Sequence, residues 1–182
     1  MALDIGRLRA MPDEHLHTKA EALKILRDAD RSVRALLERL PPRAFTKAGI
    51  GGGEWSPKEL VAHMAFWEVN ALEAIEAWER GDTAPVDVTL RAQSLTVVNW
   101  DGLIRMSKGS STQVKERAAD VHDQLLGRIR PMPTRRWNAP PTPRGKRPLG
   151  LRIGSILGGP GGPFMHVNAH LGDLQAFVDL HG

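Results

Sequence analysis

Three histidines have the spacing and the surroundings of a metal site. His166 and His170 stand four residues apart in the run HVNAH near the C-terminus. On an α-helix this spacing places two imidazoles on one face, one turn apart. His63 lies about a hundred residues upstream among apolar residues, in the run WSPKELVAHMAFWE. We therefore expect these three side chains to meet inside a helical protein and to bind a divalent metal ion.

The chemistry of such a site follows from its ligands. Neutral imidazole binds Zn, Ni, Fe or Mn, and the chain has no cysteine that could serve instead. Three protein ligands leave coordination positions open for water or substrate, as in catalytic rather than structural sites. A metal in that setting lowers the pKa of a bound water or thiol and polarises a bound oxygen. The residues indicate a reactive metal but do not select among the four.

Two carboxylates could orient the imidazoles. Glu59 precedes His63 by four residues and Asp173 follows His170 by three, so each could accept a hydrogen bond from the second ring nitrogen of its neighbour. Asp173 could also bind the metal directly. Val167 occupies the glutamate position of the HExxH motif of zinc proteases, so the general base of that motif is missing. Spacing alone leaves open whether the histidines bind metal or are hydrogen-bonded core residues.

The first and last helices have clear limits in the sequence. The first should run from Thr18 to Leu40, because Thr18 and Glu21 form a capping-box pattern and apolar residues then recur three and four apart. Residues 1–17 would precede it as a short arm. The last helix should span Phe164 to Leu180 and turn both of its histidines inward.

The second helix has the strongest start signal. Ser56 is its N-cap, a proline takes the first helical position, and Glu59 completes a capping box. The helix should end near Arg80, just before a glycine. His63 lies at the edge of its Trp-rich apolar face, and Asn70, two turns later, points nearly the same way. Because buried polar groups need partners, both side chains are candidates for a site.

The middle of the chain is less clearly divided. We expect a loop over 83–88 and a third helical region over 90–106, which contains Asn99. A further helix follows a Gly-Ser break, with Ser110 in another capping-box pattern. Whether these two regions form one broken helix or two is left open by the sequence. His122 lies beside an apolar stripe, where a partly buried structural role is expected.

Residues 132–163 form a basic segment rich in Gly and Pro, which we predict to be a long loop. We interpret it as a solvated loop. It could instead be a lid whose arginines bind an anionic substrate beside the metal, or a site for phosphate, carboxylate or RNA. Its basic residues are Arg135, Arg136, Arg144, Lys146, Arg147 and Arg152.

Length, composition and charge limit the kinds of protein that this chain can be. A length of 182 residues suits one domain, here residues 18–182 after the arm. There is no apolar run long enough to cross a bilayer and no secretory h-region. The absence of cysteine excludes disulfides and fits a reducing cytoplasm. The net charge is +4, but basic and acidic residues alternate outside the basic segment, so we expect no membrane partner and no nucleic-acid interface on the rest of the chain.

The motifs together resemble one protein family. WSPKELVAHMAFWE, then VVNW, then HVNAHLGDL are similar in type and order to the DinB/YfiT-like superfamily, over about residues 18–180. The resemblance implies an all-α four-helix bundle with long loops, in which His63, His166 and His170 hold a divalent metal. The superfamily includes bacterial bacillithiol- and mycothiol-dependent S-transferases and the N-terminal domain of maleylpyruvate isomerase. The Gly/Pro-rich stretch before the last helix departs from the family pattern.

The leading hypothesis is a metal-dependent S-transferase or isomerase that uses a low-molecular-weight thiol and a small electrophilic substrate. Asn70, Asn99 and the arginines of the basic segment are then candidate substrate contacts. The alternatives are a metal-dependent hydrolase, a non-catalytic stress-response or binding bundle, and nucleic-acid binding through the basic segment. A homodimer could form through large apolar residues, namely Trp78, Trp100 and Trp137.

Overall fold

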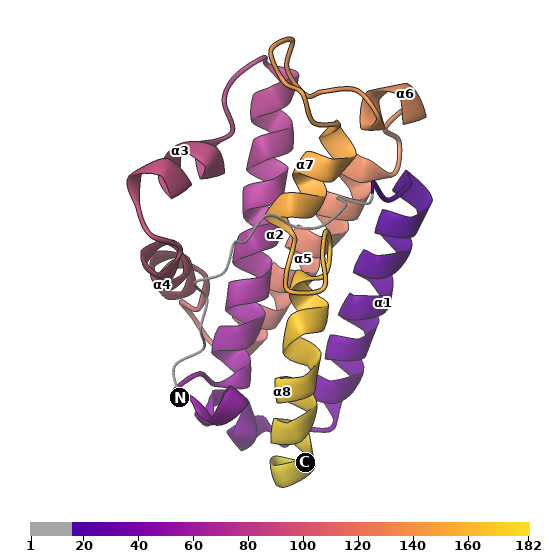
Figure 1. Cartoon of the computed structure of the whole chain (residues 1–182). Helices are drawn as coiled ribbons and strands as arrows, with labels where there is room; N and C mark the ends of the chain where they lie inside the picture. Colours follow the sequence, from indigo (N-terminus) through magenta and orange to yellow (C-terminus); the bar gives the residue numbers. More distant parts are fainter. Residues whose placement is uncertain (1–15) are drawn as a thin grey trace.

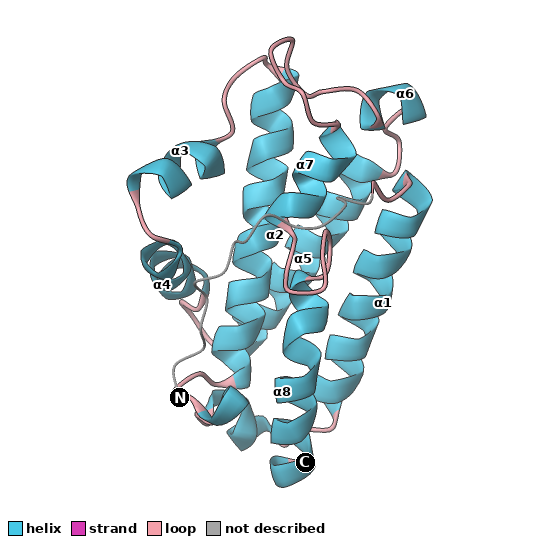
Figure 2. Ribbon diagram, viewed as in Figure 1, coloured by secondary structure: helices cyan, strands magenta, loops and turns pink. Residues whose placement is uncertain are grey.

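Four long helices run alongside one another and form the body of the protein (Figure 1). The computed structural model describes residues 16–182, so the predicted arm lies almost entirely outside the described residues. Within them, every regular element is helical, as Figure 2 shows, and the predicted all-α four-helix bundle is confirmed. The long helices are α1 Lys19–Glu38, α2 Pro57–Glu79, α5 Ser111–Ile129 and α8 His166–His181.

The capping boxes set where three of these helices begin. In each one, the N-cap hydroxyl accepts from a backbone N–H of the first turn while the third helical side chain accepts from the N-cap backbone. All three were predicted from the sequence, and each lies in its expected place: Thr18 with Glu21, Ser56 with Glu59, and Ser110 with Gln113.

The central helix is α2. It packs against α5 along its length and is also contacted by α3 Pro85–Ala92, α4 Leu95–Met106 and α7 Leu149–Ile156. Consequently it is buried on nearly all sides, including a row of fully covered apolar side chains. Two polar residues in the middle of α2, Glu68 and Asn70, are buried with it.

The prediction of a loop over 83–88 was correct for residues 83–84 and wrong for 85–88. Helix α3 begins at Pro85, because a proline is pre-organised for the first helical turn and Val86 is buried, 2% exposed, as its anchor. The predicted region 90–106 therefore contains the end of α3 and the whole of α4. Helices α4 and α5 are separate elements, which settles the question that the sequence left open.

The basic segment is also more ordered than predicted. It contains a short helix, α6 Thr134–Trp137, and helix α7, with turns between them. The Trp137 ring is fully buried and stacks on Phe164, with ring centroids 6.1 Å apart. Gly150 of α7 lies directly against that ring, where a Cβ atom would collide with it. Apolar residues within 149–157 thus fold part of the predicted loop onto the bundle.

Two of the three tryptophans predicted for a dimer interface are core residues. Trp78 is 4% exposed and Trp137 is not exposed at all, so neither can meet a partner chain. Trp100 on α4 is 54% exposed.

Two short 3-10 helices, Pro42–Thr46 and Ile50–Gly52, close the lower end of the bundle in Figure 1. None of the helices in residues 16–182 combines the length and hydropathy that a bilayer crossing requires.

Candidate metal centre

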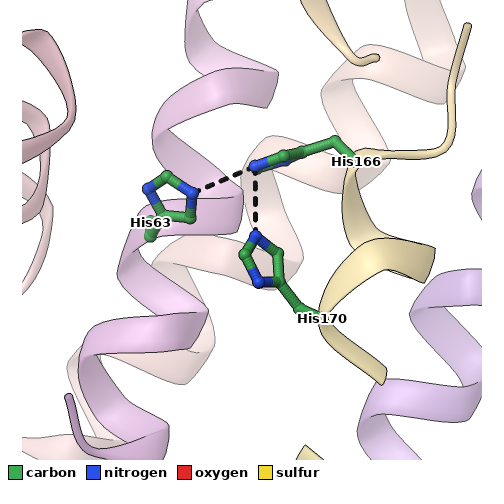
Figure 3. Close-up of side chains that lie close together, drawn as sticks. All are labelled: His63, His166 and His170. Carbon is green, nitrogen blue, oxygen red and sulfur yellow. Dashed lines mark hydrogen bonds between the residues drawn. The ribbon is translucent and has the colours of Figure 1, made fainter. Parts of the chain in front are cut away.

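The three predicted histidines do meet (Figure 3). His166 Nε2 lies 3.0 Å from His63 Nε2 and 3.4 Å from His170 Nε2. The three potential ligand atoms lie within 4.8 Å of one another. His63 comes from the second turn of α2 and the other two from the first turns of α8, so two segments about a hundred residues apart build the cluster.

The turn before α8 places its first residue. Phe164 has a φ of +64°, which a bulky side chain adopts only when its surroundings hold it there. Here its ring is buried against Trp137, and its backbone N–H donates to the Gly154 carbonyl over 3.0 Å. Gly154 allows this close approach, since a Cβ there would collide with the Phe164 ring. His166 follows at the first position of α8, with its backbone N–H donating to the Leu157 carbonyl.

Two tryptophans form part of the wall around the cluster. The Trp55 ring lies 4.9 Å from the His63 ring, and the Trp67 ring lies 6.1 Å from the His166 ring, measured between centroids. Trp67 Nε1–H donates to Asn99 Oδ1 over 3.0 Å, in the buried layer between α2 and α4. The predicted substrate contact Asn99 therefore reaches the cluster through Trp67 and fixes the orientation of that ring.

Burial keeps the imidazoles neutral. It lowers the pKa of His63 well below its ordinary value, with a further effect of the two neighbouring imidazoles. It lowers the pKa of His166 to about 3, and His170 adds to the shift. Burial also lowers the pKa of His170, against the opposing charge of Asp173. Near pH 7 all three rings keep lone pairs that can bind a metal.

Two of the three pairwise distances in the cluster suit a shared divalent metal. Tetrahedral ligands at about 2.0–2.1 Å from zinc stand about 3.4 Å apart, and the two short Nε2 distances are 3.0 and 3.4 Å. Three Nε2 atoms facing one point cannot all be satisfied by hydrogen bonds to each other, because His166 Nε2 carries at most one proton. A shared cation would satisfy all three.

The two predicted orienting carboxylates do not hydrogen-bond to the histidines. Glu59 Oε2 instead accepts from the backbone N–H and the hydroxyl of Ser56, both over 2.7 Å. His63 Nδ1 is buried and has no hydrogen-bond partner in the described chain, so the expectation for Glu59 was wrong. Asp173 acts on His170 only through its charge, and its carboxylate lies beside the backbone of Gly51.

Asn70 has a structural role. Its side-chain Nδ2 donates to the Phe66 carbonyl, one turn earlier in α2, over 3.0 Å, and the residue is 7% exposed. This bond satisfies the buried amide within the helix itself. The structure therefore does not support Asn70 as a substrate contact.

The arginines of the basic segment mostly bind their own chain. Arg136 donates to the carbonyls of Pro140 and Pro141, and Arg152 is paired with Asp87 of α3. Arg147 donates to the Ser155 hydroxyl over 2.9 Å. These bonds brace the turns and helices of the segment. They argue against a dedicated anion- or RNA-binding loop made of all six basic residues.

The two tryptophans of the wall were the site residues that sequence reasoning missed. Trp67 stands four residues after His63, so a helical reading already places its ring beside the imidazole. Trp55 precedes the N-cap of α2, and only the path of the 3-10 turns brings it back over His63.

Comparison with known proteins identifies the family. The sequence pattern of the DinB superfamily matches residues 6–158 of this chain. The chain belongs to the DinB superfamily. The matched span contains His63 but ends before α8, so His166 and His170 as site residues rest on the geometry above. Among the curated proteins, none matches the sequence.

Two solved structures share the fold of this DinB-superfamily member. An uncharacterised protein from Escherichia coli UTI89 is 18% identical, with a TM-score of 0.72 over 90% of this chain and 94% of that one. A protein from Streptococcus pneumoniae is 15% identical, with a TM-score of 0.65 over 97% of this chain and 94% of that one. At such identities the likeness concerns the fold alone.

Proposed function

We propose that this protein is a divalent-metal-dependent enzyme that acts on a small electrophile with a low-molecular-weight thiol, as an S-transferase or isomerase. The observation that carries the proposal is the convergence of three neutral imidazoles with their Nε2 atoms turned toward one another: His63, which is buried, and His166 and His170, which are partly buried. Three such ligands leave positions open for an exogenous ligand. Zn, Ni, Fe and Mn all suit this donor set.

A metal held there would act as a Lewis acid and lower the pKa of a thiol or water beside it. Residues beside the histidines set the environment of the bound metal. The Trp55 and Trp67 rings cover part of the cluster and limit access of bulk water. The N-terminus of the 16-residue helix α8 carries His166, and a helix N-terminus favours negative charge such as a thiolate.

Thiol binding can be tested on protein loaded with Co²⁺ as a spectroscopic substitute. Adding 2-mercaptoethanol or cysteine should produce a sulfur-to-cobalt charge-transfer band in wild type and none in His170→Ala. Turnover of an electrophile panel should then require both metal and thiol. A matched control is His17→Ala, because His17 lies outside the cluster with its ring against Phe164.

Other outcomes separate the competing functions. Metal-dependent turnover without thiol would indicate a hydrolase, with water in the open positions. Metal binding with neither thiol binding nor turnover would favour a non-catalytic binding or stress-response bundle. We further propose that the enzyme works in the cytoplasm, where low-molecular-weight thiols stay reduced. We also propose that it forms a homodimer.

A further inference from the structure

A second buried polar group lies on the other side of α2, away from the histidine cluster. Glu68 of α2 and His122 of α5 are joined by a hydrogen bond of 2.8 Å between Oε1 and Nδ1. Both side chains are more than nine-tenths buried, at 7% and 6% exposure. Neither residue belongs to the proposed metal centre.

The pair borders a cavity between α1, α2 and α5. Its volume is about 230 Å³, and its walls are mostly apolar, including Leu26, Val33, Val61 and Met64. For comparison, an apolar protein cavity of about 150 Å³ is large enough to bind benzene. The space therefore accommodates one aromatic ring with a small substituent.

The charges around this cavity balance. Three acidic and three basic side chains border it, namely Asp30, Glu38, Glu68, Arg34, Lys115 and His122. Asp30 and Arg34 also pair with each other, with Oδ2 and Nε 2.8 Å apart. A charged guest would leave one of these charges uncompensated, which is costly in a partly buried place. The lining thus favours a neutral molecule.

One buried polar atom of His122, which lines this cavity, makes no hydrogen bond in the described chain, namely Nε2. The nearest carboxylate oxygen, Asp30 Oδ2, is 3.9 Å away, too far for a hydrogen bond. A hydroxyl oxygen between the two could accept from Nε2–H and donate to Oδ2. Because Nε2 has almost no accessible surface, a guest can reach it only if a neighbouring side chain turns, and the partly exposed Asp30 is the group that we expect to move.

The state of His122 makes Nε2 a donor. Burial lowers its pKa, but the hydrogen bond to Glu68 and the charges of Glu68 and Asp30 together outweigh burial, so the pKa of His122 is raised. A protonated imidazole donates from both nitrogens. Nδ1 is already engaged by Glu68, which leaves Nε2–H for a ligand.

We propose that the cavity between α1, α2 and α5 is a second ligand site that binds a small neutral aromatic alcohol, with His122 Nε2 as donor and Asp30 as acceptor for its hydroxyl. The Glu68–His122 pair orients the donor, and the apolar walls hold the ring. The site is independent of the metal centre, so its occupancy does not need metal.

The test compares phenol with toluene, which has the same shape but no hydroxyl. In an apolar cavity without a polar anchor, toluene would bind more tightly, because it is the less water-soluble of the two. We expect wild type to bind phenol saturably in calorimetric titration and at least about tenfold more tightly than toluene, the size of one charged hydrogen bond. His122→Phe keeps a ring and removes the donor, and should reverse the preference.

Two further variants test whether phenol binds in this cavity and whether any loss of binding comes from a folding defect. Ala119→Leu fills the cavity from its partly exposed rim on α5 without removing a charge, and should abolish binding of both compounds. His63→Ala, on the opposite side of α2, should leave phenol affinity unchanged. Equal affinity for phenol and toluene, no saturable phenol binding, or phenol binding lost in His63→Ala and kept in Ala119→Leu would overturn the proposal.

Discussion

At the scale of single residues, the three neutral histidines make the metal-free protein sensitive to acid. A group whose pKa is lowered by folding takes up its proton in the unfolded chain first, so its contribution to stability is complete above the unfolded pKa and is lost below it. For His166 the window runs from its ordinary value of 6.5 down to about 3. Within that window the unfolding free energy falls by about 1.4 kcal/mol per pH unit for this group.

We therefore predict that His166→Gln has a shallower pH dependence of stability than wild type. Glutamine does not titrate. In the absence of metal, the unfolding free energy of wild type relative to that of the variant should therefore fall by up to about 1.4 kcal/mol for each unit as the pH falls from 6 to 4. Denaturant unfolding at several pH values measures this. Parallel curves for the two proteins would mean that His166 is not held neutral in the folded state.

The residue-level chemistry was only partly visible in the sequence. The i, i+4 spacing of His166 and His170 and the apolar surroundings of His63 suggested the cluster, and the resemblance of the motifs to the DinB/YfiT-like superfamily decided the prediction. The Glu68–His122 pair was not predicted, because the residues lie 54 positions apart and neither spacing nor composition shows which carboxylate a buried histidine meets. Glu59 was predicted both to complete the capping box and to orient His63; the structure uses its carboxylate in the capping box alone.

At the scale of elements, the start of α2 supports the site. Ser56 and Glu59 close the first turn of the helix that carries His63 in its second. Ser56→Ala should reduce stability by about 1 kcal/mol and, because fraying reaches His63, should also weaken metal binding. Thr18→Ala removes the equivalent capping box of α1, away from the site, and is the matched control. Unfolding curves and metal titration measure both. Equal metal affinity in the two variants would contradict the link between cap and site.

A pair of glycines tests the packing of α7. Gly150→Ala places a methyl group in the Trp137 ring and should destabilise the protein by about 1–3 kcal/mol, as overpacking does. Gly127→Ala lies on the exposed face of α5 with no neighbour near its Cβ and should stabilise by about 0.5–1 kcal/mol. Thermal unfolding shows whether each substitution lowers or raises the stability of the protein. A neutral Gly150→Ala would show that α7 is not seated on Trp137.

The sequence predicted long, capped helices better than short helices. Three of the four long helices have capping boxes, and the starts of all four were predicted within one or two residues. Helices α3 and α7 are eight residues each, and the Pro and Gly around them read as loop signals. The φ of +64° at Phe164 could not be predicted, because it is imposed by burial of the ring against Trp137 rather than by a local preference.

At the scale of the whole molecule, five of the six exposed large apolar side chains in the described residues lie on α3 and α4, the sixth being Leu180. The five are 40–54% exposed: Val88, Leu90, Val97, Trp100 and Ile104. Together they form the natural surface for the proposed homodimer, with Trp100 as the one predicted interface tryptophan that the core does not use. Which of the three tryptophans is exposed could not be predicted from the sequence, because the burial of a tryptophan depends on how the helices pack.

We predict that Trp100→Lys converts the protein to a monomer with its fold intact. Sedimentation should show a single species near 20 kDa for the variant and a heavier one for wild type. Leu180→Lys, at a 78% exposed position at the end of α8, should remain dimeric as the control. Wild type sedimenting only at the monomer mass would refute the dimer.

Whether the three histidines bind a metal is best decided by elemental analysis of gently purified wild type, His63→Ala, His170→Ala and the control His17→Ala. We expect close to one divalent ion per chain in wild type and in the control, and loss of the ion in both cluster variants with their helical content kept. Wild type that carries no metal and takes up none of Zn²⁺, Ni²⁺, Fe²⁺ or Mn²⁺ on titration would contradict this expectation, and the three histidines would then be polar residues of the core.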